Sequence, residues 1–350
     1  MRASTPRSRK SNRWSVRWVA SRSSGRHSTD GWCGTRGEPL RVTVLAGGVG
    51  GARFLRGLCQ HTDPRHTTVI GNTGDDEEFF GLHVAPDLDT VLYTLAGRVD
   101  RARGWGLRDE TFHCLQAVGA LGGPTWFQLG DRDLATHLMR TTWQRAGWRL
   151  SRITATLARA HGVRVRLLPM TDDRVRTFVH TERGRLPFQE YLVRGRARGR
   201  VRRIEVAGAA QARPGPGVLA ALRTSDGVVI APSNPLVSIG PMLALPGVRK
   251  ALGRRRGTAV AVSPLVGGRA VRGPLPRMLR GLGIEVSPRG IARLYRGLVD
   301  VFVLDRVDRA WASRVEALGL RAVVTDTVMR TPAAAARLAR RVLRALDGAP

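Results

Sequence analysis

Short apolar runs recur along this chain, and polar or turn-forming residues follow them. Runs of this length that are rich in β-branched residues predict buried strands of a parallel sheet. Because the carboxyl ends of parallel strands meet at one edge of a sheet, we expect the residues that follow the runs to lie on that edge. The predicted strands are 41–45, 67–70, 163–168, 227–230, 258–262, 299–304 and 321–324.

Helical patterns separate these strands. A helix is predicted to start at Phe54, two helices lie within 138–160, and a helix over 332–346 closes the chain. Residues 91–160 are predicted to be mainly a helical insertion, and 175–179 with 188–193 to be the strands of a small β-hairpin around Gly184. The pattern therefore predicts an α/β fold with a parallel sheet, a helical insertion and a small β-hairpin element.

A glycine-rich stretch joins the first predicted strand to the first helix. Gly47, Gly48, Gly50 and Gly51 let the backbone turn tightly and approach a ligand, and Arg53 can donate to a phosphate. The helix N-terminus would face the same anion. No Lys-Ser/Thr pair follows the glycines, and the G-x-G-x-x-G pattern breaks at Arg53. The alternative is a structural turn without a ligand.

Acidic residues follow the second predicted strand. Asn72 lies in the turn, and Asp75 and Asp76 begin a run of four acids. Such a run repels itself, and a hard cation with diphosphate oxygens as further ligands would relieve the repulsion. The alternative is a solvated acidic turn. In the next stretch Asp87 or Asp89, close to Thr90, is predicted to cap a helix, which leaves the second carboxylate unexplained.

Two further loops carry polar side chains. In 127–137, Asp131 is predicted to be a helix N-cap, Arg132 is free to reach outward, and His137 follows on the helix. A lone helical histidine is more often structural, but this loop is the densest polar cluster in the chain. Ser233 and Asn234 lie between prolines, where they suit base, ribose or phosphate contacts or bond their own turn.

Composition narrows the class of protein. The chain has 350 residues, a formal net charge of +31 and only 5% aromatic residues. Nearly all basic residues are arginine, since lysine occurs only at positions 10 and 250, so the charge indicates codon composition more than nucleic-acid binding. No apolar run is long enough to span a bilayer. The cysteines are odd in number, at positions 33, 59 and 114, and lack a C-x-x-C pattern, which indicates a reducing cytoplasm.

The first forty residues differ from the rest. Residues 1–40 are rich in serine, arginine and glycine and predict a disordered basic tail, or translated upstream sequence with a start near Arg41. Residues 41–350 are then expected to form a single α/β domain.

Several of these loops together resemble the 2-phospho-L-lactate transferase, or CofD, family, including its phosphoenolpyruvate-dependent bacterial members. The resemblance covers about 41–346. The segments that carry it are 47–53, 71–76, 86–90, 130–137, 188–191, 232–235 and 263–264. It implies a Rossmann-like, three-layer α/β fold, a homodimer and dependence on Mg²⁺.

The resemblance also implies a reaction of coenzyme F-420 biosynthesis. A ribityl hydroxyl of 7,8-didemethyl-8-hydroxy-5-deazariboflavin attacks an acyl-2-diphospho-5′-guanosine donor, the distal phosphoryl moves with its organic acid, and GMP leaves. Whether that acid is lactyl, enolpyruvyl or glyceryl stays open. The chain departs from the family at Glu77 and Glu78, which leaves open whether the metal cluster has further ligands.

Roles for the candidate residues follow from this reaction, because phosphoryl transfer depends on charge neutralisation and alignment. The glycine stretch would hold the diphosphate. The remaining assignments are Asp75 and Asp76 for Mg²⁺; Asp87, Asp89 and Arg132 for the deazaflavin, with one carboxylate accepting the hydroxyl proton; Ser233 and Asn234 for guanosine; and His137 for phosphate.

Three other classes compete with the transferase. A UDP-sugar-binding regulatory protein of the same superfamily would not need Asp89 and Arg132. A dinucleotide oxidoreductase is disfavoured because no acid ends the second strand, where a ribose would bind. The interpretation as a nucleic-acid-binding protein is supported by the net charge alone.

Overall fold

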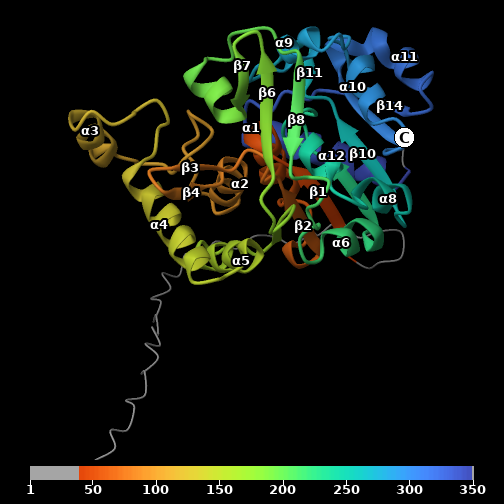
Figure 1. The fold of residues 1–350 in the computed structure, drawn as a ribbon. Coiled ribbons are helices and arrows are strands. Elements are labelled where there is room, and N and C mark those ends of the chain that lie inside the picture. The colour runs from red at the N-terminus through yellow and green to blue at the C-terminus, as the bar shows by residue number, and fades with distance from the viewer. Residues whose placement is uncertain (1–38, 349–350) are drawn as a thin grey trace, which may run out of the picture. The chain divides into compact units, whose positions relative to one another are not determined.

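The structure, a computed structural model, describes residues 39–348 (Figure 1). The predictions for residues 1–40 therefore fall, except at positions 39 and 40, outside the described part of the chain. Within the described residues, no helix is long and apolar enough to cross a membrane.

A parallel sheet forms the centre of the described residues. Its seven strands run in the order β14-β13-β10-β9-β1-β2-β5, and every neighbouring pair is parallel. All seven predicted strands are confirmed, although the third of them, predicted over 163–168, covers 166–169, the residues that pair with residues 68–71. The strands are β1 (Val42–Ala46), β2 (Thr67–Gly71), β5 (Arg166–Pro169), β9 (Gly227–Ile230), β10 (Thr258–Val262), β13 (Val301–Asp305) and β14 (Arg321–Thr325).

Helices cover both faces of this sheet. Alternate residues of β1 enter two different cores, with Val44 in one and Leu45 in the other. The Val44 face packs against α1 (Gly48–Leu58), α2 (Pro86–Leu95), α5 (Leu150–Ala160) and α12 (Pro332–Leu346). The Leu45 face packs against α6 (Val218–Thr224), α7 (Gly240–Ala244), α8 (Val248–Gly253), α9 (Leu275–Gly281), α10 (Pro288–Leu294) and α11 (Ala312–Glu316). The three-layer α/β prediction is confirmed.

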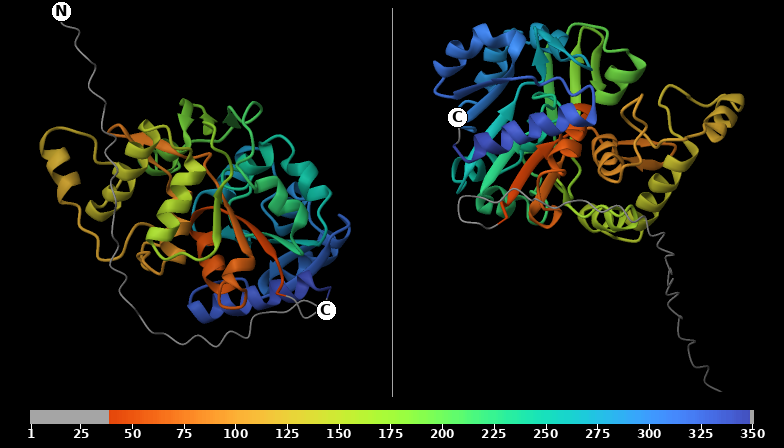
Figure 2. Two further views of the ribbon diagram at one scale, coloured as in Figure 1. Left: turned by 90° about the horizontal axis from the view of Figure 1, so that it is seen from below. Right: turned by 180° about the vertical axis from the view of Figure 1, so that it is seen from behind.

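The C-terminal helix packs closely on the helix that follows the glycine stretch. Figure 2 shows α12 lying across the sheet beside α1. A Cβ on Gly57 would lie 2.3 Å from the Ala335 carbonyl oxygen, so only glycine permits this approach. The predicted bounds of α12, 332–346, match those in the structure.

An excursion from the sheet precedes α5. It contains the hairpin strands β3 (Glu77–Phe79) and β4 (Leu82–Val84), then α3 (His113–Ala120) and α4 (Asp131–Arg145). The hairpin was not predicted, because its acidic residues favour a turn. Residues 91–160 contain the second half of α2 and helices α3 to α5, and α2 and α5 belong to the layer that covers the sheet.

A second, antiparallel sheet follows β5. Its strands are β7 (Gly184–Pro187), β6 (Arg176–Thr181) and β8 (Arg203–Ala207). The predicted strand over 175–179 overlaps β6, whereas β7 and β8 were not predicted. The prediction of a strand over 188–193 is wrong, because this segment is helical and includes a π-helix, η2 (Glu190–Arg194). Phe188 and Tyr191 are both buried, and their spacing of three places them on one helical side. Shorter elements are η1 (Pro64–His66), β11 (Leu265–Val266), β12 (Arg269–Ala270) and η3 (Arg306–Trp311).

The glycine stretch is itself the start of α1. This helix begins at Gly48, not at Phe54 as predicted, with Gly47 as its N-cap. Gly48 has φ +63°, which favours glycine, and it makes the turn from β1 into the helix. The N-terminus of α1 therefore lies at the carboxyl edge of the sheet, next to the loops that follow β2 and β9.

Candidate functional site

A cavity of about 690 Å³ lies at this edge of the sheet. Loops after β1, β9, β10 and β14 line it, together with the starts of α2 and α4. The predicted site residues that line it are Gly47, Gly48, Gly50, Arg53, Asp75, Asp87, Asp89, Thr90, His137, Ser233 and Asn234. Gly51, Asn72, Asp76, Asp131 and Arg132 are not among the lining residues.

The glycine stretch is held in place by the loop after β9. The Ser233 hydroxyl donates to the Gly47 carbonyl at 2.8 Å, and Ser233 Oγ lies 3.1 Å from the Gly47 amide nitrogen that donates to it. A Cβ on Gly50 would lie 2.4 Å from the Pro232 carbonyl oxygen. A Cβ on Gly51 would lie 2.5 Å from Ser233 Oγ, so Gly51 packs against this loop. Ser233 therefore shapes the glycine stretch.

Asn234 bonds its own turn. Its side-chain oxygen accepts a hydrogen bond from the Leu236 amide at 2.9 Å, and its backbone carbonyl accepts from Ser238 and Ile239. This is the Asx-turn that the sequence offered as the alternative to a ligand contact. Because both Ser233 and Asn234 also line the cavity, they form its wall while their main polar bonds stay within the protein.

A buried amide joins two carboxylates at the cavity. The side-chain nitrogen of Asn72 donates to Asp75 at 3.1 Å and to Asp87 at 3.0 Å. Gln189, from the helical segment after β7, donates to the other Asp75 oxygen at 2.7 Å. All four side chains are buried, and Asn72 has no exposed surface. Gln189 was not among the predicted site residues.

These two carboxyl groups are costly to ionise. Burial raises the pKa of Asp75 well above its usual value, and repulsion from Asp87 and Asp76 raises it further. Burial also raises the pKa of Asp87 to about 6, against the hydrogen bonds from Asn72, Gly48 and Ser238. Two such groups at one cavity wall favour a cation, whose charge would offset their repulsion.

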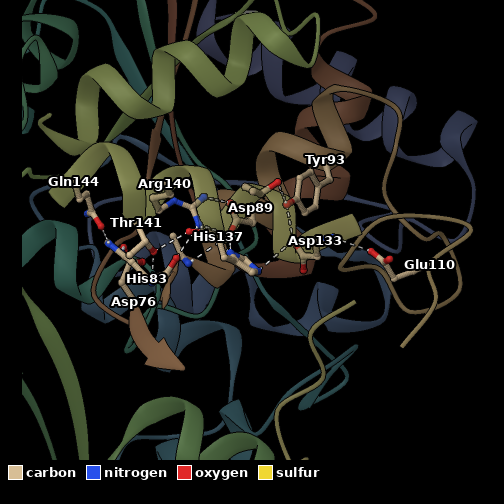
Figure 3. A network of polar contacts seen from close by, with 12 residues as sticks. Asp76, His83, Asp89, Tyr93, Glu110, Asp133, His137, Arg140, Thr141 and Gln144 are labelled. Atoms are coloured by element: carbon tan, nitrogen blue, oxygen red, sulfur yellow. Dashed lines mark hydrogen bonds and ion pairs between the residues drawn. The ribbon is translucent and has the colours of Figure 1, made fainter. Parts of the chain in front are cut away.

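Asp76 points away from its neighbour. Its carboxylate pairs with His83 Nε2 at 2.8 Å, and the other ring nitrogen, Nδ1, lies 2.8 Å from Gln144 Oε1 (Figure 3). The carboxylate that lines the cavity together with Asp75 is Asp87, and Asp76 of the predicted Asp75–Asp76 metal pair is not a lining residue. Asp76 stays a buried partner of His83, and burial raises its pKa.

Asp75 and Asp87 fit a magnesium ion. Carboxylate oxygens are its preferred protein ligands, and Mg²⁺ commonly uses one or two carboxylates together with substrate phosphates and water. Among residues 39–348, no group of three or more histidine, cysteine, aspartate or glutamate side chains is arranged to hold a metal ion. The two carboxylates could therefore hold Mg²⁺ only with ligands from a substrate or solvent.

A second network lies between α2 and α4 (Figure 3). Arg140 has a side chain only 2% exposed, and its guanidinium binds both oxygens of Asp89. It also donates to the His83 carbonyl at 3.3 Å and to His137 Nδ1 at 3.2 Å. Asp89 lines the cavity, but Arg140 neutralises its charge.

The prediction that Asp87 or Asp89 is the N-cap of this helix is wrong, because the N-cap of α2 is Ala85. The Ala85 amide nitrogen lies 3.4 Å from Asp89 Oδ2.

Tyr93, Asp133 and His137 continue this network toward the cavity. The Tyr93 hydroxyl donates to Asp133 Oδ1 at 2.5 Å and lies 2.9 Å from Thr136 Oγ1. His137 Nε2 lies 3.3 Å from the same Asp133 oxygen. Tyr93, Asp133 and His137 all line the cavity.

The start of α4 differs from the prediction. Asp131 lies inside the helix, after the N-cap Gly130, so its predicted N-cap role is wrong. Its carboxylate instead accepts from the amides of His113 and Cys114, each at 3.0 Å, and so caps α3. Glu110 caps α4 by accepting from the amides of Arg132 and Asp133. The Arg132 side chain is exposed and lies outside the cavity.

Three arginines and an aromatic loop complete the cavity. Arg53, Arg272 and Arg330 line it, and none of them forms an ion pair with a carboxylate within the described residues. Trp126 and Phe127 line it from the loop before α4, where Phe127 stacks on Phe79 at 4.0 Å. The cavity therefore offers unpaired positive charge, buried carboxylates and flat apolar surface.

Sequence reasoning missed Arg140 and Tyr93, although a signal for Arg140 exists. Asp133, His137, Arg140 and Gln144 recur at intervals of four, three and four, so they share one face of α4. A polar stripe on a helix that also carries His137 indicates a buried network. For Tyr93 the sequence offered no comparable signal.

A family model described as 2-phospho-L-lactate transferase CofD matches residues 42–342. The chain belongs to this family. It is therefore an enzyme, a transferase of the family that acts in coenzyme F-420 biosynthesis. The resemblance seen in the sequence is confirmed.

Curated relatives agree with the family. A protein of Streptomyces griseus named phosphoenolpyruvate transferase is 47% identical over 310 residues, covering 87% of this chain and 98% of that protein. A protein of Methanosarcina mazei named 2-phospho-L-lactate transferase is 38% identical over 304 residues, covering 87% of this chain and 100% of that protein.

A solved structure supports the fold. A crystal structure of a Bacillus halodurans protein superimposes with a TM-score of 0.61 at 18% identity, covering 87% of this chain and 100% of that one. At this identity the likeness concerns the α/β fold alone.

Proposed function

We propose that this transferase moves a phosphoenolpyruvyl group from an enolpyruvyl-diphospho-guanosine donor to 7,8-didemethyl-8-hydroxy-5-deazariboflavin, with release of GMP. The observation that carries the proposal is one cavity where the N-terminus of α1 and the Asp75–Asp87 pair lie together. The first suits a diphosphate and the second suits the cation that accompanies it. The enolpyruvyl group is preferred to lactyl because relatives near 47% identity bear the name phosphoenolpyruvate transferase.

The donor would bind along the glycine stretch. The backbone amide of Gly50 lies in the first turn of an eleven-residue helix, where the peptide dipoles favour anions, while the amide of Gly48 donates to Asp87. Arg53 on the same helix lines the cavity without a carboxylate partner among the described residues, so its charge is available to a phosphate. Arg272 and Arg330 would add positive charge for the donor's other anionic groups.

Asp75 and Asp87 would hold Mg²⁺. Bound there with the diphosphate, the ion supplies positive charge that offsets the charge of the reacting phosphates. Asn72 and Gln189 fix the two carboxylates by donating to them, so the pair is oriented before any ligand arrives. Both acids must lose their protons to hold the ion, so the raised pKa of Asp87 predicts that the metal-free protein binds Mg²⁺ more weakly as the pH falls through about 6.

The acceptor would lie against the aromatic loop. Trp126 and Phe127 offer flat apolar surface for the deazaflavin rings, and the ribityl chain would extend toward the carboxylates. In the transfer a ribityl oxygen bonds to the distal phosphorus, the bond from that phosphorus to the bridging oxygen breaks, and GMP leaves with that oxygen. The hydroxyl proton goes to a carboxylate or to solvent.

A transfer assay tests this proposal. The full chain is mixed with deazariboflavin, Mg²⁺ and each donor in turn, carrying lactyl, enolpyruvyl or glyceryl groups, and GMP release and product mass are measured. Product with the enolpyruvyl donor alone supports the proposal. Product with the lactyl donor alone would show that the transferred group is phospholactyl and not phosphoenolpyruvyl. Folded protein that makes no product but binds a UDP-sugar would support the regulatory alternative.

Two variants test the metal site. Asp87→Asn is expected to abolish the Mg²⁺ dependence together with turnover, because one carboxylate of the pair is lost. Asp76→Asn is expected to keep that dependence, since Asp76 faces His83. The opposite result would return the site to the Asp75–Asp76 pair. Light scattering of the same samples tests the expected homodimer.

A further inference from the structure

His137 lies between Arg140 and two carboxylates. The guanidinium of Arg140 can only donate, and its Nη1 lies 3.2 Å from His137 Nδ1. The same ring nitrogen lies 3.8 Å from Asp89 Oδ2. The other ring nitrogen, Nε2, is buried and lies 3.3 Å from Asp133 Oδ1, and it forms no hydrogen bond of regular geometry among the described residues. The ring of His137 therefore lies against the Asp133 carboxylate.

Asp133 has one occupied and one open oxygen. Its Oδ1 accepts from the Tyr93 hydroxyl at 2.5 Å and faces His137 Nε2. Its Oδ2 has no hydrogen-bond partner within residues 39–348, although the residue is only 8% exposed and lines the cavity. Burial opposes ionisation of Asp133, but the contact with His137, the hydrogen bond from Tyr93 and the charge of Arg140 lower its pKa. The group is therefore a fixed, ionised acceptor.

The charge of Asp133 selects its ligand. A carboxylate repels the phosphates of the donor and binds groups that donate hydrogen bonds. Asp89, the other acid of this network, is already neutralised by Arg140. The positive groups that suit the donor, Arg53 and Arg272, form no ion pair with Asp133.

We propose that Asp133 binds the acceptor by accepting a hydrogen bond on Oδ2 from a hydroxyl of its polyol chain, and that Tyr93, His137 and Arg140 are positioning residues that hold this carboxylate. The inference rests on the proposed function for the identity of the acceptor. It moves the acceptor contact from Arg132, which faces solvent, to the residue that follows it. Figure 3 shows how Tyr93, His137 and Arg140 converge on Asp133 and Asp89.

The test separates binding of the two substrates. The dissociation constant of deazariboflavin is measured by fluorescence titration of the full chain, and KM is measured for acceptor and donor. Asp133→Asn keeps the shape but removes the charge, so we expect the acceptor constants to rise roughly ten- to hundredfold while the donor KM stays unchanged. Asp109→Asn is the matched control, because Asp109 is an exposed carboxylate outside the cavity.

Positioning residues are tested by graded variants. Tyr93→Phe removes only the hydroxyl and should raise the acceptor KM about three- to tenfold with the donor KM unchanged. His137→Gln retains a donor for Asp133 and should bind the acceptor more tightly than His137→Ala. Thermal melting verifies that each variant is folded. If Asp133→Asn does not fold, Tyr93→Phe decides the question.

Different failures have different meanings. Unchanged acceptor binding by folded Asp133→Asn, or equal increases in both KM values, would overturn the inference while wild-type turnover upholds the proposed function. A wild-type protein that binds deazariboflavin but makes no product would overturn the proposed function. In that case loss of binding in Asp133→Asn would still support the role of Asp133.

Discussion

The buried ion pair between Asp89 and Arg140 allows the sharpest test of the structure. Replacing Arg140 by methionine keeps much of its volume and removes the charge. The Asp89 carboxylate, 6% exposed, would then be buried with two distant neighbours, the Ala85 amide at 3.4 Å and His137 Nδ1 at 3.8 Å. Removing one partner of a buried pair costs about 3–5 kcal/mol, because the remaining charge has lost both water and its partner.

The structure indicates that the cost lies in the upper part of this range. Arg140 makes bonds to both Asp89 oxygens, to the His83 carbonyl and to His137, so its loss leaves several buried acceptors unpaired. In a domain of this size the change corresponds to a decrease in Tm on the order of 10 °C. The deficit should shrink as the pH falls, because the unpaired carboxylate can then be buried as a neutral acid.

The assay is a double-mutant cycle. Thermal and urea unfolding are compared for Arg140→Met, Asp89→Asn and the double variant at pH 8 and pH 5. Each single change is expected to cost several kcal/mol, and the double change is expected to cost less than their sum by about 2–4 kcal/mol. Additive losses, or single variants within about 1 kcal/mol of wild type, would refute the assignment of a buried, mutually dependent pair.

Three further predictions follow from the site. Because the pKa of Asp87 is raised to about 6 from an ordinary 3.8, its ionised form costs stability at pH 8, and this cost disappears as the pH falls toward 4. In the protein without metal, Asp87→Asn should therefore raise the Tm relative to wild type more at pH 8 than at pH 5; an equal Tm difference at both pH values would contradict the shift. Gly50→Ala would place a Cβ 2.4 Å from the Pro232 carbonyl oxygen, so we expect the free energy of unfolding to fall by roughly 1–3 kcal/mol and the donor KM to rise. Gly253→Ala is the control: its Cβ would meet nothing within 4 Å, so both quantities should stay unchanged. Glu110→Ala removes the acceptor for two amides of α4 and should cost about 1 kcal/mol by urea unfolding; no loss would show that these amides find another partner.

The sequence by itself determined the sheet and its functional edge. Periodic apolar runs predicted all seven strands and α12, because burial on both faces leaves a continuous apolar signature that needs no knowledge of partners. Parallel strands place their carboxyl ends at the same edge of the sheet, so the polar loops that follow them had to meet there. That is why the glycine stretch, Asp75 and Asp87 were found without coordinates.

Only the tertiary structure decided where each polar side chain points. Adjacent residues such as Asp75 and Asp76 look equivalent in sequence, yet one meets Asn72 and Gln189 and the other meets His83. The same holds for Arg132, which faces solvent, and Asp133, which faces the cavity. The direction of a side chain depends on partners far away in the chain. The buried position of Arg140, for example, depends on Asp89, fifty-one residues earlier. Local pattern therefore fixes which elements form, while long-range hydrogen bonds and charges fix which side chains make the site.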